Sequence, residues 1–379
     1  MKLLHLGDLH LGKRLHGFDL LDDQRFILEQ VLDLCDAHGV DAVALAGDLY
    51  DVSMPPTGAV LLLDWFLTAL ADRHIAVLAV AGNHDSADRL DYAAALLARQ
   101  GVHLVGRFTG TVPSVVMQDD SGPVRFCLLP FVRAATVRHA LPEVDIPDYT
   151  AALAAALATL PPREAGERRV LLAHQLFLAG GAPPECAGSE NSAAALNIGT
   201  VDGVDAAVLD GFDYVALGHI HRPQQVGRPT VRYSGAPLCY SLDECGAAKS
   251  AVLVTLEQGE PGIELLPLTP RRALRHLTGT LAELTAAPKC PDDYIWATLT
   301  DETPVPEAMA RLRAAYPNAM RLEYQPRGEE LDLSTAAVAA LHTQDFDELF
   351  ARFFAQQHGR DLTEAERDAL HAMRQEVSQ

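Results

Sequence analysis

The sequence lacks a long hydrophobic run, and this absence argues against a membrane-spanning protein. Its 379 residues contain no stretch of about 20 uncharged apolar residues, the length that a bilayer span requires. The opening residues, MKLLHLG, have the pattern of a strand and not that of a signal peptide, in which a basic segment precedes an apolar one. We therefore expect a cytoplasmic protein with no membrane partner.

The sequence also lacks paired cysteines and an excess of positive charge. None of its 6 cysteines forms a Cys-x-x-Cys pair, which argues against a zinc knuckle or a disulfide framework. The 30 Lys and Arg residues face 51 Asp and Glu residues, so the formal net charge is −21. Taken alone, this charge argues against a nucleic-acid partner, because Lys and Arg supply most of the affinity for phosphates.

Short apolar runs alternate with helical patterns over residues 1–270. Runs at 2–7, 41–47 and 75–82 are separated by amphipathic segments at 18–39 and 56–74. This alternation predicts parallel strands joined by right-handed crossovers in a sheet covered on both faces, with a site beyond the carboxyl ends of the strands. Further strand-like runs occur at 124–130, 169–175, 213–219 and 250–256.

The remaining sequence divides into segments of different character. Residues 176–203 are small, polar and rich in Gly and Pro, which predicts a long loop over one edge of the site. A strand, helix and strand follow near residue 270, and the sequence then becomes helical and charged. We predict three domains, at residues 1–268, 269–328 and 329–379.

Several apolar runs end in a side chain that can bind a metal ion. One such tripeptide, the opening DLH, could equally be a strand followed by a polar turn. Its recurrence at five strand ends favours a metal site instead. The residues are Asp8, His10, Asp48, Asn83, His84, Asp85, His174, His219 and His221.

Carboxylate, amide and imidazole groups together form a mixed oxygen and nitrogen donor set. Such a set suits manganese, iron or zinc and suits calcium poorly. The donors are too many for one ion, but they divide well between two ions about 4 Å apart that share a carboxylate. Asp48 is the natural bridge.

The ordered motifs DLH, GDLYD, GNHD, a lone His after a strand, and GHIH resemble the five-part signature of the calcineurin-like metallophosphoesterases. This resemblance implies an α/β fold, a four-layered αββα sandwich with two metals at the strand ends. The flanking segments LHLGKRLHG, DVSMPP and YSGAPLCYSLDE are similar to those of the SbcD family of bacterial nuclease subunits. That similarity adds a small α+β capping domain and a C-terminal helical extension.

The resemblance also implies a role for each residue. Two divalent metal ions, with manganese expected, would be bound at two sites that share Asp48. His84 would face the scissile phosphate, and Asp85 would hold its imidazole; the alternative is that His84 is merely structural. The first metal would take Asp8, His10, Asp48 and His221, and the second Asp48, Asn83, His174 and His219.

DNA enters as a partner through the resemblance. Double-strand ends, hairpins and single strands are the expected substrates, although the net charge disfavours them. Six cations near the motifs could follow a DNA backbone, while each by itself could be an ordinary surface residue. They are Lys13, Arg14, Arg89, Arg133, Arg138 and Arg222.

Protein partners are expected as well. The tail carries one apolar helical stripe that either packs on its own domain or, as the resemblance implies, binds an SbcC-type ATPase. The family also suggests a homodimer, for which the helix near residues 56–73 is a candidate interface. The stripe consists of Phe346, Leu349, Phe350, Phe353 and Phe354.

The expected function is a metal-dependent DNA exonuclease and endonuclease that is stimulated by ATP through its partner. Two other functions stay open at this point. One is a phosphodiesterase or phosphatase that acts on a nucleotide, lipid or phosphoprotein. The other is a binding scaffold that has kept the fold and lost the chemistry.

Overall fold

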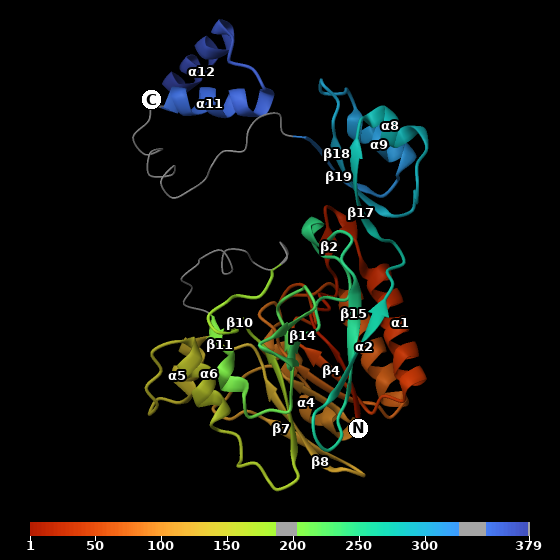
Figure 1. Ribbon diagram of the computed structural model, residues 1–379, viewed down its shortest axis with the longest axis vertical. Coiled ribbons are helices and arrows are strands. Elements are labelled where there is room, and N and C mark those ends of the chain that lie inside the picture. The colour runs from red at the N-terminus through yellow and green to blue at the C-terminus, as the bar shows by residue number, and fades with distance from the viewer. Residues whose placement is uncertain (187–202, 326–345, 378–379) are drawn as a thin grey trace. The chain divides into compact units, whose positions relative to one another are not determined.

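The computed structural model describes residues 1–186, 203–325 and 346–377, which form two compact units (Figure 1). The sandwich unit comprises Met1–His276 and Asp292–Trp296, and the C-terminal unit comprises Leu277–Pro291 and Ala297–Gln379. The predicted domain boundaries at residues 268 and 328 stay predictions. Most of the loop expected at 176–203 lies outside the described residues.

Two six-stranded sheets form the centre of the sandwich unit. Sheet 1 has the order β16-β15-β1-β4-β5-β6 and sheet 2 the order β13-β14-β12-β9-β8-β7. The central strands of each sheet are parallel. Antiparallel pairing occurs at both edges of sheet 2 and at the β15–β16 edge of sheet 1, whereas the other edge strand of sheet 1, β6, pairs parallel with β5. The strands of sheet 1 are β1 (Lys2–Leu6), β4 (Ala42–Ala46), β5 (Ala76–Val80), β6 (Val102–Val105), β15 (Lys249–Thr255) and β16 (Gly262–Leu268); those of sheet 2 are β7 (Ser114–Asp119), β8 (Gly122–Leu129), β9 (Arg168–His174), β12 (Tyr214–Gly218), β13 (Gln224–Val226) and β14 (Arg228–Tyr233).

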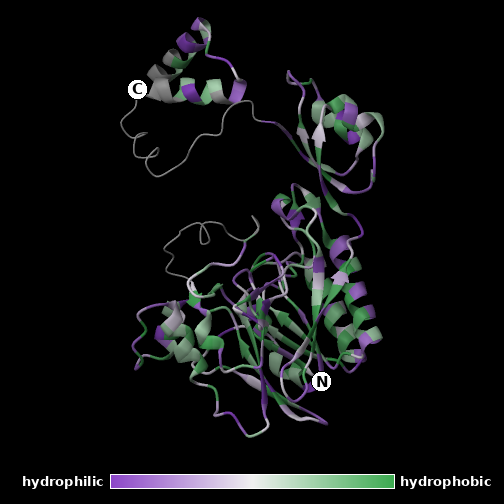
Figure 2. Ribbon diagram, viewed as in Figure 1, coloured by the Kyte–Doolittle hydropathy of each residue, from purple (hydrophilic) through white to green (hydrophobic). Residues whose placement is uncertain are grey.

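The two sheets pack face to face through apolar side chains. Because side chains alternate along a strand, β8 directs Phe126 and Leu128 into the layer between the sheets, while Cys127 and Leu129 join the core on the opposite face. Residues of β1, β4, β5 and β15 enter the same inner layer from sheet 1. Figure 2 shows these central strands as hydrophobic.

Helices cover the outer face of each sheet. On sheet 1, α1 (Leu21–His38) and α2 (Thr57–Asp72) bury one apolar side each, and α1 ends at Gly39, whose φ of 61° is the left-handed geometry that Gly adopts without strain. On sheet 2, α5 (Ala134–Ala140) and α6 (Tyr149–Leu157) pack on the outer core. The layers therefore run helix, sheet, sheet, helix, as the αββα expectation states.

Short elements connect these layers. They are β2 (Arg14–Leu15), β3 (Phe18–Asp19), α3 (Ala87–Asp91), α4 (Ala94–Leu97), η1 (Ala98–Gln100), β10 (Phe177–Leu178), β11 (Val204–Asp205), η2 (Ala206–Leu209) and η3 (Leu242–Glu244).

All seven predicted strands of the sandwich unit are present, but the alternation pattern alone did not divide them between two sheets. It also missed β14 and the edge strands, of which β6 has only 4 residues and β16 is largely exposed. Such strands carry a weak hydrophobic signal, because they are short or have only one buried face.

The C-terminal unit continues from a three-stranded sheet with the order β17-β18-β19. The predicted strand, helix and strand are confirmed, as are both tail helices; β17 and α8 were not predicted. No helix within the described ranges is both long and apolar enough to cross a membrane. The elements are β17 (Leu274–Gly279), α8 (Leu281–Ala286), β18 (Tyr294–Leu299), α9 (Ala308–Ala315), β19 (Ala319–Tyr324), α11 (Phe346–His358) and α12 (Glu364–Val377).

The layer between the sheets should dominate the stability of the sandwich unit. Phe126 is fully buried there, so Phe126→Ala is expected to lower the free energy of unfolding by about 3–5 kcal/mol, measured by urea denaturation. Val116→Ala, on the same sheet but with a side chain that is 44% exposed, is the matched control and should change it by less than about 0.5 kcal/mol. Equal losses in the two variants would contradict this account of the core.

Candidate metal centre

The predicted metal ligands lie where parallel strands of both sheets end. Asp8 and His10 follow β1, Asp48 follows β4, and Asn83 follows β5; His174 ends β9, and His219 and His221 follow β12. Backbone hydrogen bonds tie these loops together: the amide of Asp8 donates to Gly47 at 3.0 Å, and that of His10 donates to Asp48 at 2.9 Å. The structure thus brings together all seven predicted ligands.

Four of these ligands have left-handed backbone geometry. The φ angles are 55° at Asp8, 43° at His10, 49° at Asp48 and 100° at His219. This geometry costs a non-glycine residue roughly 1–3 kcal/mol, and such strain concentrates at functional sites. Here it turns each side chain inward directly after a strand ends.

One group of donors surrounds the expected first metal site. Single ligand atoms of Asp8, His10 and His221 lie within 4.8 Å of one another. The Nε2 atoms of His10 and His221 are 3.1 Å apart, and Nε2 of His10 is 3.5 Å from Oδ2 of Asp48. Two imidazole nitrogens that face each other next to carboxylates are suitable ligands for a cation.

A second group shares Asp48 with the first. Nε2 of His174 lies 3.3 Å from Oδ2 of Asp48 and 3.0 Å from Oδ1 of Asn83. Nδ1 of His219 lies 3.1 Å from the same Asn83 oxygen. Oδ2 of Asp48 therefore lies beside a histidine of each group, where a ligand shared by two ions would be expected.

The protonation pattern of the donors fits a metal pair. Nδ1 of His174 donates to the carbonyl of Ala46 at 2.8 Å, so Nε2 is the nitrogen that faces the other donors and would bind a metal ion in place of a proton. Oδ2 of Asp8 is buried and has no hydrogen-bond partner among the described residues. An orphaned carboxylate oxygen in this setting indicates a site for a cation.

The electrostatic field of the site also favours positive charge. Burial lowers the pKa of His174, but the Asp48 carboxylate outweighs it and raises that pKa to about 9. Burial would raise the pKa of Asp48, yet His174 and His10 hold it well below its usual range. For His219, burial and the neighbouring His174 lower the pKa to about 3, so this ring is neutral and able to coordinate.

Two glycines make this close arrangement possible. A Cβ on Gly47 would overlap the ring of His174, and one on Gly82 would overlap the carboxylate and the backbone of Asp48. Gly47 also has a φ of 86°, which only glycine adopts easily. The Gly-Asp and Gly-Asn pairs of the motifs are thus required by packing around the ligands.

His84 lies beside the donors without belonging to the predicted ligand sets. Its amide donates to Oδ1 of Asp48 at 2.9 Å, and its Nδ1 donates to the carbonyl of Asp51 at 2.7 Å. Since a carbonyl only accepts, Nδ1 carries a proton and Nε2 is the nitrogen available to a substrate.

The expectation that Asp85 holds the His84 imidazole is wrong. The Asp85 carboxylate instead accepts hydrogen bonds from the amides of Leu49, Tyr50 and Gly82 at 2.9–3.1 Å. Burial and the nearby Asp48 raise the pKa of Asp85 to about 6. Asp85 therefore fixes the loops that carry Asp48 and Asn83, while the backbone of Asp51 orients His84.

Sequence reasoning also missed the residues that support the ligands from behind. Oδ1 of Asp51 lies 3.2 Å from Nδ1 of His10, and Oε1 of Glu244 lies 3.6 Å from Nδ1 of His221. Glu244 is buried and ion-paired with buried Lys249, which also donates to the carbonyl of His221 at 3.3 Å. The segments GDLYD and YSLDE contain both acids, but nothing in the sequence links them to a particular histidine.

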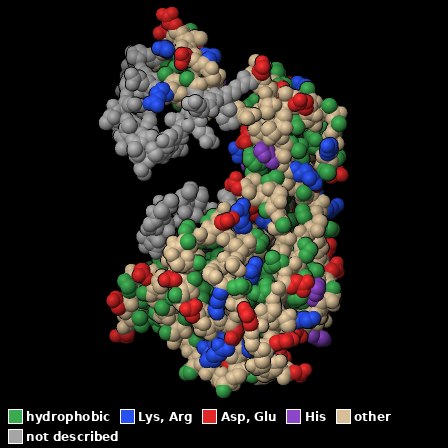
Figure 3. Space-filling model, viewed as in Figure 1, with side chains coloured by type: hydrophobic (Ala, Val, Ile, Leu, Met, Phe, Trp, Pro, Cys, Tyr) green, Lys and Arg blue, Asp and Glu red, His purple; other side chains and the backbone are tan. Residues whose placement is uncertain are grey.

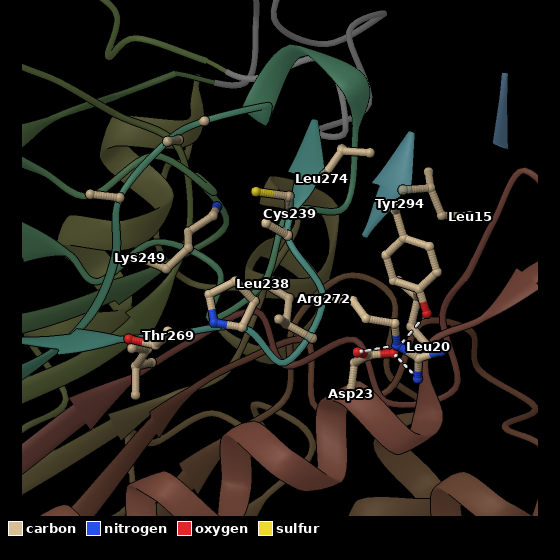
Figure 4. Close-up of a pocket in the computed structure, with 16 residues that line it drawn as sticks. Leu15, Leu20, Asp23, Leu238, Cys239, Lys249, Thr269, Arg272, Leu274 and Tyr294 are labelled. Carbon is tan, nitrogen blue, oxygen red and sulfur yellow. Dashed lines mark hydrogen bonds and ion pairs between the residues drawn. The ribbon is translucent and has the colours of Figure 1, made fainter. Parts of the chain in front are cut away.

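Two cavities of the sandwich unit differ in their relation to the predicted metal ligands. A cleft of about 470 Å³ is lined by Asn83, His84 and His219 together with loop residues. The other, of about 270 Å³, is lined by none of the predicted metal ligands. It is mainly apolar, and its Asp23 carboxylate accepts hydrogen bonds from Arg272 and Tyr294 (Figure 4). The first cleft is therefore the place for a substrate.

An αββα sandwich with paired oxygen and nitrogen donors at the strand ends defines a metallophosphoesterase. Comparison with known proteins agrees: the family model described as calcineurin-like phosphoesterase matches residues 1–223, more than half of the chain, which therefore belongs to this family. A second model, the SbcD C-terminal domain, described as type 5 capsule protein repressor C-terminal domain, matches residues 270–358. Together the two matches support the SbcD-type resemblance of the motifs.

Among solved structures, the chain is similar to a dimetal phosphatase from Danio rerio. The sequence identity is 12%, the TM-score is 0.39, and the match covers 71% of this chain and 97% of that one.

The Glu244 carboxylate should matter for metal binding, because it holds the ring of His221. We expect Glu244→Gln to weaken Mn²⁺ binding to the full chain by about 10- to 100-fold, measured by isothermal titration calorimetry. Glu257→Gln, at an exposed position on the same unit, is the control and should bind as the wild type does. Urea denaturation of each variant separates loss of fold from loss of ligand support, and unchanged affinity in folded Glu244→Gln would refute the assignment.

Proposed function

We propose that this protein is the nuclease subunit of an SbcCD-type complex. It would act as an exonuclease and endonuclease that hydrolyses phosphodiesters at DNA double-strand ends, in hairpins and in single strands. The observation that carries the proposal is the donor cluster centred on Asp48, with His84 at the adjoining cleft. The match of residues 270–358 to the SbcD C-terminal domain supports a nuclease over other phosphoesterases.

Two metal ions would be held by the two groups that share Asp48. Asp8, His10 and His221 would complete one site, and Asn83, His174 and His219 the other. When bound, such a pair makes a water acidic enough to deprotonate near neutral pH and offsets charge on the phosphoryl group. The oxygen and nitrogen donors suit Mn²⁺.

His84 is the proposed catalytic residue among the protein's own side chains. With Nδ1 bonded to Asp51, its Nε2 can donate a hydrogen bond to a phosphate oxygen or a proton to the leaving sugar oxygen. The hydrogen bond from the His84 amide to Asp48 holds His84 beside the donor cluster. Asn83, its neighbour in the chain, lines the same cleft.

The acidic composition requires an explanation, because DNA is a polyanion. On the face drawn in Figure 3, Lys and Arg are scattered among Asp and Glu and do not form one patch. We propose that much of the affinity for DNA is supplied by a partner ATPase of the SbcC type. The proposed use of ATP and DNA supports a cytoplasmic location for this activity.

The tail is the proposed binding site for that ATPase. On α11, Phe353 is 53% exposed although it is large and apolar. An exposed apolar residue on an amphipathic helix favours a helix-in-groove contact with another protein. The side chains of Phe346 and Leu349, which complete the predicted stripe, lie outside what the structure describes.

A homodimer is proposed as well. The outer side of α2 exposes Leu61 to 61% and Val60 to 42%, and Tyr92 and Leu96 are exposed nearby in the sequence. Exposed apolar side chains on the outer side of α2 favour a protein interface there.

The catalytic role of His84 can be tested directly. With Mn²⁺, the wild type should cut an end-labelled linear duplex or a closed circular single strand, and His84→Gln should lower turnover by about 10²- to 10⁴-fold while Mn²⁺ affinity is retained. His139→Gln, an exposed histidine of α5, is the control. Full turnover in His84→Gln would contradict the role; hydrolysis of a small chromogenic diester with neither DNA cut would favour the phosphodiesterase alternative.

The proposed role of the tail predicts that metal-dependent hydrolysis and ATP-stimulated cleavage can be lost separately. A chain that ends at residue 329 should keep metal-dependent hydrolysis but lose ATP-stimulated cleavage when an SbcC-type ATPase is added. In the full chain, Phe353→Glu should reduce that stimulation because it places a charge in the docking surface. Normal stimulation in both variants would rule out the tail as the binding site.

A further inference from the structure

The cleft beside the metal ligands contains one arginine with no internal partner. The guanidinium of Arg133 has no hydrogen bond or ion pair with any residue that the structure describes, although it borders the cleft. An unpaired cation at a substrate cleft offers a site for an anion. The remaining lining comes from Asp51, Val52, Ser53, Asn83, His84, Phe131, Tyr149, Gln175, Leu176 and His219.

The other cations expected along a DNA backbone are mostly engaged elsewhere. Arg222 is ion-paired, as is Lys13, whose partner is Asp51; Arg14 and Arg138 donate to backbone carbonyls. The two ion pairs offset the charge of Lys13 and Arg222, and the contacts with carbonyl groups tie Arg14 and Arg138 to their own loops. The partners are Asp51 for Lys13 (2.8 Å), Glu185 for Arg222 (2.6 Å), Gly17 for Arg14 (2.9 Å) and Ile146 for Arg138 (2.7 Å).

The loop after β8 places Arg133 close to the metal ligands. The amide of Phe131 donates to the carbonyl of Ala81 at 2.8 Å, and its ring meets the ring of His174 edge-on with centroids 6.4 Å apart. Arg133 is two residues further on, so its Cα lies at most about 7 Å from that of Phe131. The extended backbone of Arg133 then leads directly into α5.

We propose that Arg133 binds the phosphate next to the scissile one and thereby selects a polynucleotide strand over an isolated phosphoester. This inference rests on the proposed function, because it assumes that the phosphoester is cut beside His84. A planar guanidinium binds phosphate oxygens through two parallel hydrogen bonds. A substrate with a single phosphate cannot make this second contact, so Arg133 favours a strand at the same catalytic centre.

The test compares two substrates within each enzyme. A short single-stranded oligothymidylate has neighbouring phosphates, and bis(p-nitrophenyl) phosphate has none. The measured quantity is the ratio of their kcat/KM values with Mn²⁺ for the wild type, Arg133→Gln, Arg133→Lys and the control Arg99→Gln, an exposed arginine outside the cleft. Circular dichroism and thermal unfolding confirm that each variant is folded.

We expect the ratio to fall roughly tenfold in Arg133→Gln, to recover in part in Arg133→Lys, which keeps the charge, and to stay constant in Arg99→Gln. The salt dependence of oligonucleotide binding should also weaken, its logarithmic slope falling by about 0.7. A wild-type ratio and slope in Arg133→Gln would overturn the inference and leave the nuclease intact. If the wild type hydrolyses neither substrate, both the inference and the proposed function fail.

Discussion

The buried carboxylate of Asp48 is the group on which the arrangement of the metal centre depends. A carboxylate leaves water only if hydrogen bonds and positive charge replace its hydration. Here the amide of His84 supplies a hydrogen bond, and the imidazole of His174 approaches from the other sheet. Sheet 1 contributes the two carboxylates, the side-chain amide of Asn83 and one imidazole, and sheet 2 contributes three imidazoles. The face-to-face packing of the sheets is therefore what assembles a complete donor set.

This assembly stores strain that the rest of the fold must offset. The left-handed ligands are unfavourable in isolation, yet they are fixed at the ends of fully buried strands such as β4. The apolar layer between the sheets provides the stabilisation that holds them. Precise placement of donors is thus a property of the whole sandwich, and the loops themselves are too short to relax independently.

The sequence predicted the strands and the ligands because both leave local signals. An apolar run that ends in Gly and then Asp or Asn, or that ends in His, can be identified without knowing what lies next to it. Asp85 was assigned wrongly, because adjacency to His84 in the chain does not reveal that its carboxylate turns toward three backbone amides. Asp51 and Glu244 were missed for the same reason: their contacts with His10 and His221 exist only after distant segments have folded together. The alternation of strands and helices predicted one sheet, and only the family resemblance predicted two.

The division of the donor set between the two sheets links metal supply to folding. Each proposed metal site takes ligands from both sheets, so a cation binds its full set of ligands only when the two sheets are packed together. A ligand of this kind stabilises the folded state by an amount that grows with the logarithm of its free concentration. The cations would therefore link the two sheets. A shortage of them would destabilise the folded protein as well as slow catalysis.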